Sequence, residues 1–224
     1  MTKKLWQASL NQKKNSNLFK FENYISKKFN KKFNNDFQKI LDWSIKNSSE
    51  FWSSFWDFTK INGRKNSKNS KKIKKSKVFY KNLFLPGSTL NFANNLLAKN
   101  DKKKVATFIS ENGFREERSW LNLNQNTNKL VQFLKNKKIK QKDRVAAYMP
   151  NTIETVEAFI STTAIGAIWS SCSPDFGVKG VIERFSQINP KILFITDQYF
   201  YNSKQINIID RLPEILKAIP SIKN

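Results

Sequence analysis

The amino-acid sequence predicts an α/β protein that joins a helical N-terminal region to the beginning of a parallel sheet with flanking helices. Between Phe19 and Phe58, aromatic residues recur every three, four or seven positions, which is the periodicity of amphipathic helices. Beyond residue 100, short apolar runs alternate with longer segments of helical spacing, and this alternation is typical of parallel α/β architecture. With 224 residues and 39% hydrophobic content, the chain can form one or two cores.

The N-terminal region, residues 1–85, is expected to be helical. Asn35 or Asp36 is suited to cap a helix that starts at Phe37. A second short amphipathic helix is predicted where aromatic residues cluster, at Phe51, Trp52, Phe55, Trp56 and Phe58. Because aromatic side chains bury large areas, we interpret these rings as core packing, or as cover for a larger domain, rather than as a ligand site.

A lysine-rich segment, residues 62–77 (NGRKNSKNSKKIKKSK), separates the two regions. It contains almost no apolar residues, and high charge with low hydrophobicity is typical of segments that form no core. We therefore expect a flexible surface loop at 62–77, and a second region at 86–224.

The second region is expected to begin with a turn at Pro86, Gly87 and Ser88. Apolar runs rich in β-forming residues predict strands at 104–110, 144–149 and 191–196. We expect these strands to be apolar on both faces, as in a buried parallel sheet. Helical spacing predicts helices at 90–97, 120–135, 153–168 and 177–187.

The formal charge of +24 is of the size expected for a nucleic-acid or membrane partner. However, the charge comes mostly from scattered Lys, accompanied by abundant Asn, Ile and 19 Phe, a set that AT-rich codons favour. Nucleic-acid grooves more often use Arg forks and interleaved aromatic rings. We therefore expect no specific nucleic-acid partner. The alternative is a non-catalytic basic protein that binds nucleic acid or an acidic partner.

The chain is expected to be cytoplasmic and to have no membrane partner. It has no apolar run of about 18 residues, and its first ten residues lack the apolar stretch of a signal peptide. The single cysteine, Cys172, can form no internal disulfide. We predict that Cys172 is a packed residue rather than a nucleophile, because no histidine is present to activate it.

Sequence motifs for catalysis are sparse. The chain contains no histidine, no GxxxxGK[ST] or GxGxxG pattern, and no pair of cysteines to hold zinc. These absences alone favour a non-catalytic module.

The most distinctive segment is 165–187, IGAIWSSCSPDFGVKGVIERFSQ. We interpret it as a junction from one helix to the next, in which Pro174 ends regular structure and Asp175 caps the following helix. Loops at the carboxyl edge of a parallel sheet bind ligands. Spacing alone leaves two interpretations open, a ligand-binding loop and a tight connection.

Residues 166–204 (GAIWSSCSPDFGVKGVIERFSQINPKILFITDQYFYNSK) resemble the acetoacetyl-CoA synthetase family, in which a GAIWSSCSPDFG block precedes an arginine-bearing helix, a QI-x-P turn and a buried strand. Further likeness lies in DRVAAYMPNTIETVEAFISTTAIGAI from Asp143, PGSTLNFANNLL from Pro86 and FWSSFWDF from Phe51. It covers most of the chain except 62–77. The resemblance implies that residues 1–85 are the helical N-terminal region of such an enzyme. Residues 86–224 would then be the truncated start of its AMP-binding domain, which is the large N-terminal domain of adenylate-forming enzymes.

The resemblance also implies a two-step ligation. Acetoacetate attacks ATP to give an acyl-adenylate and pyrophosphate, and the thiol of CoA then displaces AMP; magnesium assists. The family's phosphate-binding loop, ribose-binding aspartate and catalytic lysine lie downstream of the matched region. The resemblance therefore implies no catalytic residue and no metal ligand in this chain. We expect the 224 residues to be inactive without the missing C-terminal portion as partner, and we do not expect ATP, magnesium and CoA, the cofactors of the complete enzyme, to bind fully to them.

One candidate cofactor site follows from the resemblance. In the family, a turn after the last matching strand contacts the nucleotide part of CoA, and acetoacetyl-CoA synthetases typically show YxYNGK there. The corresponding residues here are Tyr201, Asn202, Ser203 and Lys204. Lys204 is suited to a CoA phosphate and Tyr201 to stacking on adenine; the alternative is an exposed turn with a solvated lysine. Because Ser203 replaces the expected glycine, we expect a less extreme backbone conformation at this turn.

Overall fold

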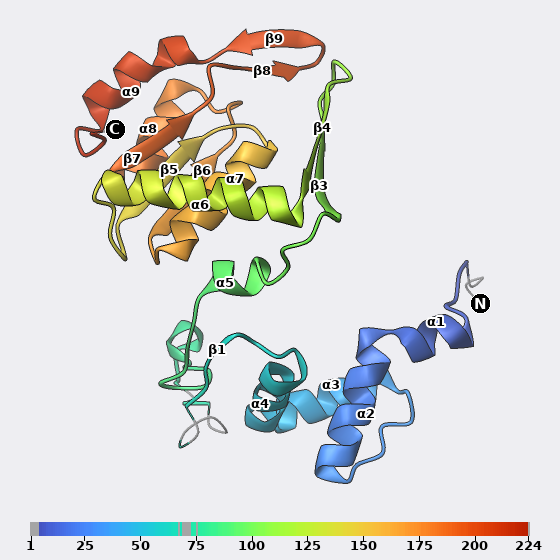
Figure 1. The fold of residues 1–224 in the computed structure, drawn as a ribbon. Coiled ribbons are helices and arrows are strands. Elements are labelled where there is room, and N and C mark those ends of the chain that lie inside the picture. Colours follow the sequence, from blue (N-terminus) through green and yellow to red (C-terminus); the bar gives the residue numbers. More distant parts are fainter. Residues whose placement is uncertain (1–4, 67, 69–72, 75, 224) are drawn as a thin grey trace. The chain divides into compact units, whose positions relative to one another are not determined.

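The computed structural model describes residues 5–66, 68, 73–74 and 76–223. The chain divides into two compact units, Met1–Leu90 and Asn91–Asn224 (Figure 1).

The first unit is helical, with α1 at Leu10–Asn15, α2 at Asn17–Phe29, α3 at Phe37–Lys46 and α4 at Ser48–Phe58. The predicted cap is confirmed at Asp36, whose carboxylate accepts hydrogen bonds from the amides of Gln38 and Lys39, at 2.9 and 3.4 Å. Such a bond satisfies amides that the first helical turn leaves without partners.

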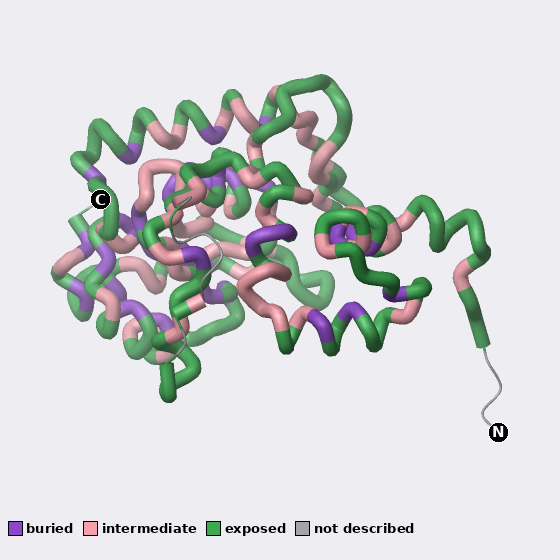
Figure 2. The backbone as a smooth tube through the Cα atoms, turned by 90° about the horizontal axis from the view of Figure 1, so that it is seen from below, coloured by how far each residue is buried: buried purple, intermediate pink, exposed green. Residues whose placement is uncertain are grey.

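Aromatic residues form the core of this unit. Phe21 and Trp43 are buried, and the Phe21 ring lies 5.7 Å from that of Phe51, while the Trp43 ring lies 5.2 Å from that of Phe29. Figure 2 shows buried stretches alternating with exposed ones along the helices, as the periodicity predicts. The interpretation of these rings as core packing is confirmed for Phe51 and Phe58 of α4, which pack against this core, whereas Trp52 and Phe55 are exposed.

The lysine-rich segment is partly paired where the structure describes it. Strand β1, Gly63–Arg64, pairs antiparallel with β2, Thr89–Leu90. Lys65 Nζ lies 2.6 Å from Asp57 Oδ1, and Lys74 forms an isolated bridge with Leu83. Because Gly63 and Arg64 are paired in β1, the predicted loop does not start at Asn62. Residues 67, 69–72 and 75 of the predicted loop lie outside the described residues, and its flexibility stays a prediction. The short 3-10 helix η1, Phe79–Lys81, follows.

The second unit contains a parallel sheet with strand order β6-β5-β7. Its strands are β5 at Arg144–Tyr148, β6 at Ile168–Cys172 and β7 at Ile192–Ile195. Two antiparallel hairpins accompany it, β3–β4 (Lys104–Ile109 and Arg115–Ser119) and β8–β9 (Gln198–Tyr201 and Lys204–Asn207). The helices are α5 at Phe92–Leu96, α6 at Trp120–Asn136, α7 at Ile153–Ala164, α8 at Val178–Ser186, η2 at Ile209–Arg211 and α9 at Leu212–Ala218.

Helices cover both faces of this sheet (Figure 1). Alternate residues of a strand point to opposite faces, and on one face Tyr148 and Leu193 pack with Phe185 of α8 and Ile215 of α9. On the other face Val145 and Ile192 pack with Leu134 of α6. This two-sided cover is what a parallel sheet requires, and it confirms the predicted α/β class.

Three strand and helix predictions need correction. The strand at 104–110 exists, but as β3 it pairs antiparallel with β4 rather than joining the parallel sheet. Its residues are half-buried or exposed and none is fully buried, so they do not require a layer of cover on both faces. The helix predicted at 153–168 ends at Ala164, because Gly166 has a left-handed backbone (φ +73°). The segment that we interpreted as a helix-to-helix junction therefore contains strand β6.

Among the residues that the structure describes, no helix has the length and apolar character needed to cross a membrane.

Candidate functional site

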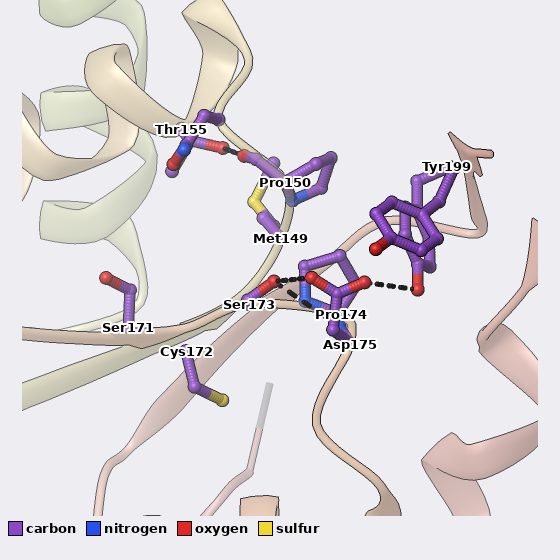
Figure 3. A pocket seen from close by; sticks show the side chains of 11 residues that line it. Met149, Pro150, Thr155, Ser171, Cys172, Ser173, Pro174, Asp175 and Tyr199 are labelled. Atoms are coloured by element: carbon purple, nitrogen blue, oxygen red, sulfur yellow. Dashed lines mark hydrogen bonds between the residues drawn. The ribbon is translucent and has the colours of Figure 1, made fainter. Parts of the chain in front are cut away.

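A cavity of about 280 Å³ lies at the carboxyl ends of β5 and β6 (Figure 3). Ligands bind at this edge of parallel sheets because loops from several strands meet there. The residues that line it come from the ends of both strands, the start of α7 and the β8–β9 hairpin: Met149, Pro150, Asn151, Thr155, Ser171, Cys172, Ser173, Pro174, Asp175, Tyr199 and Tyr201.

The rim near α7 is fixed by hydroxyl groups. Thr155 Oγ1 donates a hydrogen bond of 2.6 Å to the carbonyl oxygen of Pro150. Thr152 is the N-cap of α7, and its hydroxyl accepts from the amide of Thr155 at 3.4 Å. The loop after β5 is thus tied to the first turn of the helix that follows it.

Asp175 joins two walls of the cavity. Its carboxylate accepts hydrogen bonds from Ser173 Oγ at 2.7 Å and from the Tyr199 hydroxyl at 2.8 Å (Figure 3). These bonds hold the pKa of the Asp175 carboxyl below its usual value. Burial, together with the hydrogen bond to Asp175, raises the pKa of Tyr199 to about 12. Asp175 is therefore an anion at neutral pH and Tyr199 a neutral donor.

The predicted role of Asp175 as a helix cap is wrong. The N-cap of α8 is Gly177, which makes no side-chain hydrogen bond. The Asp175 carboxylate bonds Tyr199 instead, 24 residues further along the chain.

Cys172 belongs to the core beneath the cavity. It is buried with Val181 and Phe185, and Figure 3 shows its side chain pointing away from the cluster of Ser173, Asp175 and Tyr199. Burial raises the pKa of the Cys172 thiol to about 11, so the reactive thiolate is scarce at neutral pH. The prediction that Cys172 is packed is confirmed.

The four residues predicted to contact CoA form the tip of the β8–β9 hairpin. Asn202 and Ser203 make the two-residue turn, and both have left-handed backbones, with φ of 50° and 59°. Our expectation of a less extreme conformation at Ser203 is wrong, because a two-residue hairpin turn of this hand needs positive φ at both positions. The Ser203 amide donates to Glu111 Oε2 at 3.1 Å, which ties this turn to the tip of the β3–β4 hairpin.

Tyr201 and Lys204 lie on one face of the hairpin. They are directly paired across the two strands, and residues paired in this way project their side chains to the same side. Tyr199, two residues before Tyr201, shares that face. Both tyrosines line the cavity, so Lys204 lies on the side of the hairpin that faces it.

We expect Ser203→Gly to stabilise the hairpin. A left-handed backbone costs a non-glycine residue about 1–2 kcal/mol, and the greater freedom of glycine in the unfolded chain offsets part of this. Hydrogen exchange of the β8 and β9 amides should therefore slow. The matched control is Ser186→Gly, which replaces another exposed serine but at the end of helix α8; it should be neutral or destabilising. Equal effects of the two changes would contradict the strain assigned to Ser203.

A second cavity of about 470 Å³ lies beside the first, between the two hairpins. It is mostly apolar, with Phe108, Phe114 and Phe200 among its lining residues, and it shares Pro150 and Tyr199 with the first cavity. Within the described ranges, no cluster of three or more His, Cys, Asp or Glu could hold a metal ion.

The sequence leaves open whether the segment 165–187, which contains Ser173, binds a ligand, and it predicts no site at Pro150 or Tyr199. A usable signal existed for Pro150 and Ser173, because each follows a strand of the parallel sheet and the ends of adjacent parallel strands meet at one edge. Tyr199 lies within β8, and no signal in the sequence joins it to this edge.

Comparison with known proteins gives a family match. The AMP-binding enzyme family matches residues 96–223, a range that contains the parallel sheet and every residue lining the cavity.

Individual proteins with similar sequences or structures agree with this family match. The chain is 33% identical over 215 residues to the acetoacetyl-coenzyme A synthetase of Rhizobium meliloti (strain 1021), covering 96% of this chain and 32% of that protein. It is 35% identical over 190 residues to the acetoacetyl-CoA synthetase of Gallus gallus, covering 84% and 28%. A solved structure, acetoacetyl-CoA synthetase from Streptomyces lividans, shares the fold with a TM-score of 0.89 at 23% identity, covering 99% of this chain and 34% of that one. The chain thus spans about a third of the length of the relatives it matches.

Proposed function

Because the chain belongs to the AMP-binding enzyme family, we propose that it is the N-terminal part of an acetoacetate:CoA ligase. The observation that carries this proposal is the identity of 33% and 35% to curated acetoacetyl-CoA synthetases over 96% and 84% of the chain. In the proposed reaction, the acetoacetate carboxylate attacks the α-phosphate of ATP and releases pyrophosphate. The CoA thiol then attacks the acyl carbon and releases AMP. Residues 86–224 would begin the adenylating domain and residues 1–85 would be its helical N-terminal region.

The role proposed for this chain is to bind the nucleotide part of CoA at the carboxyl-edge cavity. The Tyr201 ring would stack on adenine, and the Lys204 ammonium group would pair with a phosphate. The shared orientation of these two side chains supports this. Asn202 and Ser203 would set their spacing through the turn. Asp175, an anion on the cavity wall, repels phosphate and accepts hydrogen bonds, so the phosphates would lie toward Lys204.

Magnesium would enter with ATP, where it commonly binds phosphate oxygens and few protein ligands. Because the described residues offer no metal cluster, we assign no residue of this chain to it. We further propose a cytoplasmic location, which the single buried cysteine supports, since no disulfide is needed.

A chimera tests the proposed activity. The 224 residues would replace the corresponding segment of the Rhizobium meliloti enzyme, and thioester formation would be measured with acetoacetate, ATP and CoA. We expect ATP-dependent acetoacetyl-CoA from the chimera and none from the 224 residues alone. A folded chimera that activates a different acid and leaves acetoacetate untouched would refute the assigned substrate.

Lys204→Met should weaken the binding of CoA to the 224-residue chain about tenfold or more, because it removes one charge-assisted hydrogen bond to phosphate. Calorimetric titration at fixed ionic strength measures this. Lys179→Met is the matched control, since Lys179 is 91% exposed on α8 and its loss changes the net charge equally. If both variants lose affinity alike, the effect is one of overall charge and Lys204 is not a ligand.

The basic charge predicts a separate, non-specific behaviour. Binding to duplex DNA should be weak and should vanish between about 50 and 200 mM salt, as counterion release requires. Fluorescence anisotropy with two unrelated duplexes should give the same affinity for both. A sequence-dependent, nanomolar complex at physiological salt would favour the alternative of a nucleic-acid-binding protein.

A further inference from the structure

The loop after β6 forms one wall of the carboxyl-edge cavity, and its internal hydrogen bonds join only near neighbours. Ser173 Oγ donates to Asp175 at 2.7 Å, and the Phe176 amide donates to the Ser173 carbonyl at 3.1 Å. Residues 173–177 have no regular secondary structure, and the side chains of Ser173 and Asp175 are exposed. Helix α8 starts after the loop without a side-chain cap. These local bonds shape the turn but do not attach it to the sheet, and exposed segments open readily, so the position of this loop depends on groups from other parts of the fold.

Arg211 and Tyr148 supply those groups. Arg211 Nη1 lies 3.1 Å from the carbonyl oxygen of Pro174 and 3.1 Å from that of Phe176. The same nitrogen donates to the Tyr148 hydroxyl. That hydroxyl lies 3.0 Å from Pro174 O and is also within hydrogen-bond reach of Phe176 O. Its one proton serves one carbonyl at a time, and the charged guanidinium serves the rest.

Both anchoring residues are themselves held firmly. Tyr148 is the last residue of the central strand β5 and is fully buried. Arg211 ends η2, and α9 begins at the next residue, with Ile215 fully buried against the sheet. One guanidinium therefore links the end of β5, the loop after β6 and the segment behind the β8–β9 hairpin. Hydrogen bonds with a charged donor are the stronger class.

We propose that Arg211 is a positioning residue of the carboxyl-edge cavity. It holds the carbonyls of Pro174 and Phe176, and thereby keeps Asp175 where its carboxylate meets the Tyr199 hydroxyl. Arg211 does not line the cavity; it acts through the loop. A wall that is already formed loses less conformational freedom when a ligand binds. The identity of that ligand, the nucleotide end of CoA, rests on the proposed function.

Calorimetric titration of the 224-residue chain with CoA tests this inference. Arg211→Met should raise the Kd about tenfold or more, because ligand binding would then have to order the wall that this charge-assisted hydrogen bond holds in the unsubstituted chain. Arg211→Lys keeps the charge but lacks the planar fork, so it should restore part of the affinity. If Arg211→Met does not fold, the Kd of Arg211→Lys for CoA is compared with that of the unsubstituted chain instead. Amide exchange of residues 173–177 should accelerate in Arg211→Met.

Leu134→Ala separates positioning from general stability. Leu134 is fully buried on the opposite face of the sheet, so its truncation destabilises the unit without touching the loop. At a temperature below its unfolding transition, Leu134→Ala should bind CoA with unchanged affinity. The rate of amide exchange in residues 173–177 should also be unchanged. An unchanged Kd in Arg211→Met would overturn the inference while the proposed function stands, as would an equal loss in Leu134→Ala. No CoA binding by the unsubstituted chain would remove the proposed ligand and this inference with it.

Discussion

Phe185→Ala should destabilise the second unit by about 3–5 kcal/mol, the usual cost of truncating a fully buried phenylalanine to alanine. Phe185 is 0% exposed and lies at the centre of the cluster that joins α8 and α9 to the sheet. Since whole domains are stable by only about 5–15 kcal/mol, this one change removes a large fraction. Amide exchange in β5 should accelerate about a hundredfold or more, as a loss above 2.8 kcal/mol implies at 1.4 kcal/mol per tenfold.

The matched control is Phe114→Ala. Phe114 lies in the turn of the β3–β4 hairpin and is 56% exposed, so its truncation should cost about 1 kcal/mol or less. The expected ranking comes from burial alone, because both changes remove the same atoms. If amide exchange in β5 accelerates equally in Phe185→Ala and Phe114→Ala, burial of Phe185 does not account for the stability of the packing between α8 and the sheet.

The sequence predicts well the elements whose structure is determined by residues close together in the chain. Strands β5 and β7 are flanked on both faces by helices, so apolar residues run without interruption through 145–148 and 192–195. The helix α3 has a carboxylate cap that acts within three residues of the chain. In each case the physical cause lies within a short window of sequence.

Two of the missed strands lack an apolar run. Strand β6 contains two serines, and its Trp169, Ser170 and Ser171 are incompletely buried. Strand β4 consists of Arg115–Ser119, which is mostly charged. A search for apolar runs therefore finds β5 and β7 of the described sheet but not these two strands.

The candidate site was only partly predictable for a related reason. The likeness to a known family led to Tyr201 and Lys204, and the register of the hairpin shows that they share a face. The partnership of Asp175 with Tyr199 joins residues 24 apart, and that of Arg211 with Pro174 joins residues 37 apart. No local pattern encodes these contacts, because they depend on how β6 and the hairpin come together.

Arg118→Met should destabilise the second unit by about 3 kcal/mol, because it leaves a buried carboxylate without its counter-ion. Arg118 Nε lies 3.1 Å from Glu157 Oε1, and the Glu157 side chain is only 6% exposed. Arg118 also pairs with Glu116 and Glu154, so its loss brings three carboxylates together without a cation. Asn126 Nδ2, 2.9 Å from the same Glu157 oxygen, would remain as a neutral partner. Urea unfolding followed by amide exchange in α7 measures the loss.

Two further variants test this explanation. Arg115→Met removes a cation from the same strand, but its pair with Glu117 is exposed, at 54% and 37%, so the cost should be about 1 kcal/mol or less. The double variant Arg118→Met/Glu157→Gln removes the orphaned charge and keeps the contact with Asn126, so it should be more stable than Arg118→Met alone. If the double variant is less stable than that single variant, lost packing of the arginine stem explains the result. In that case the unpaired charge of Glu157 is not the main cause of the stability lost in Arg118→Met.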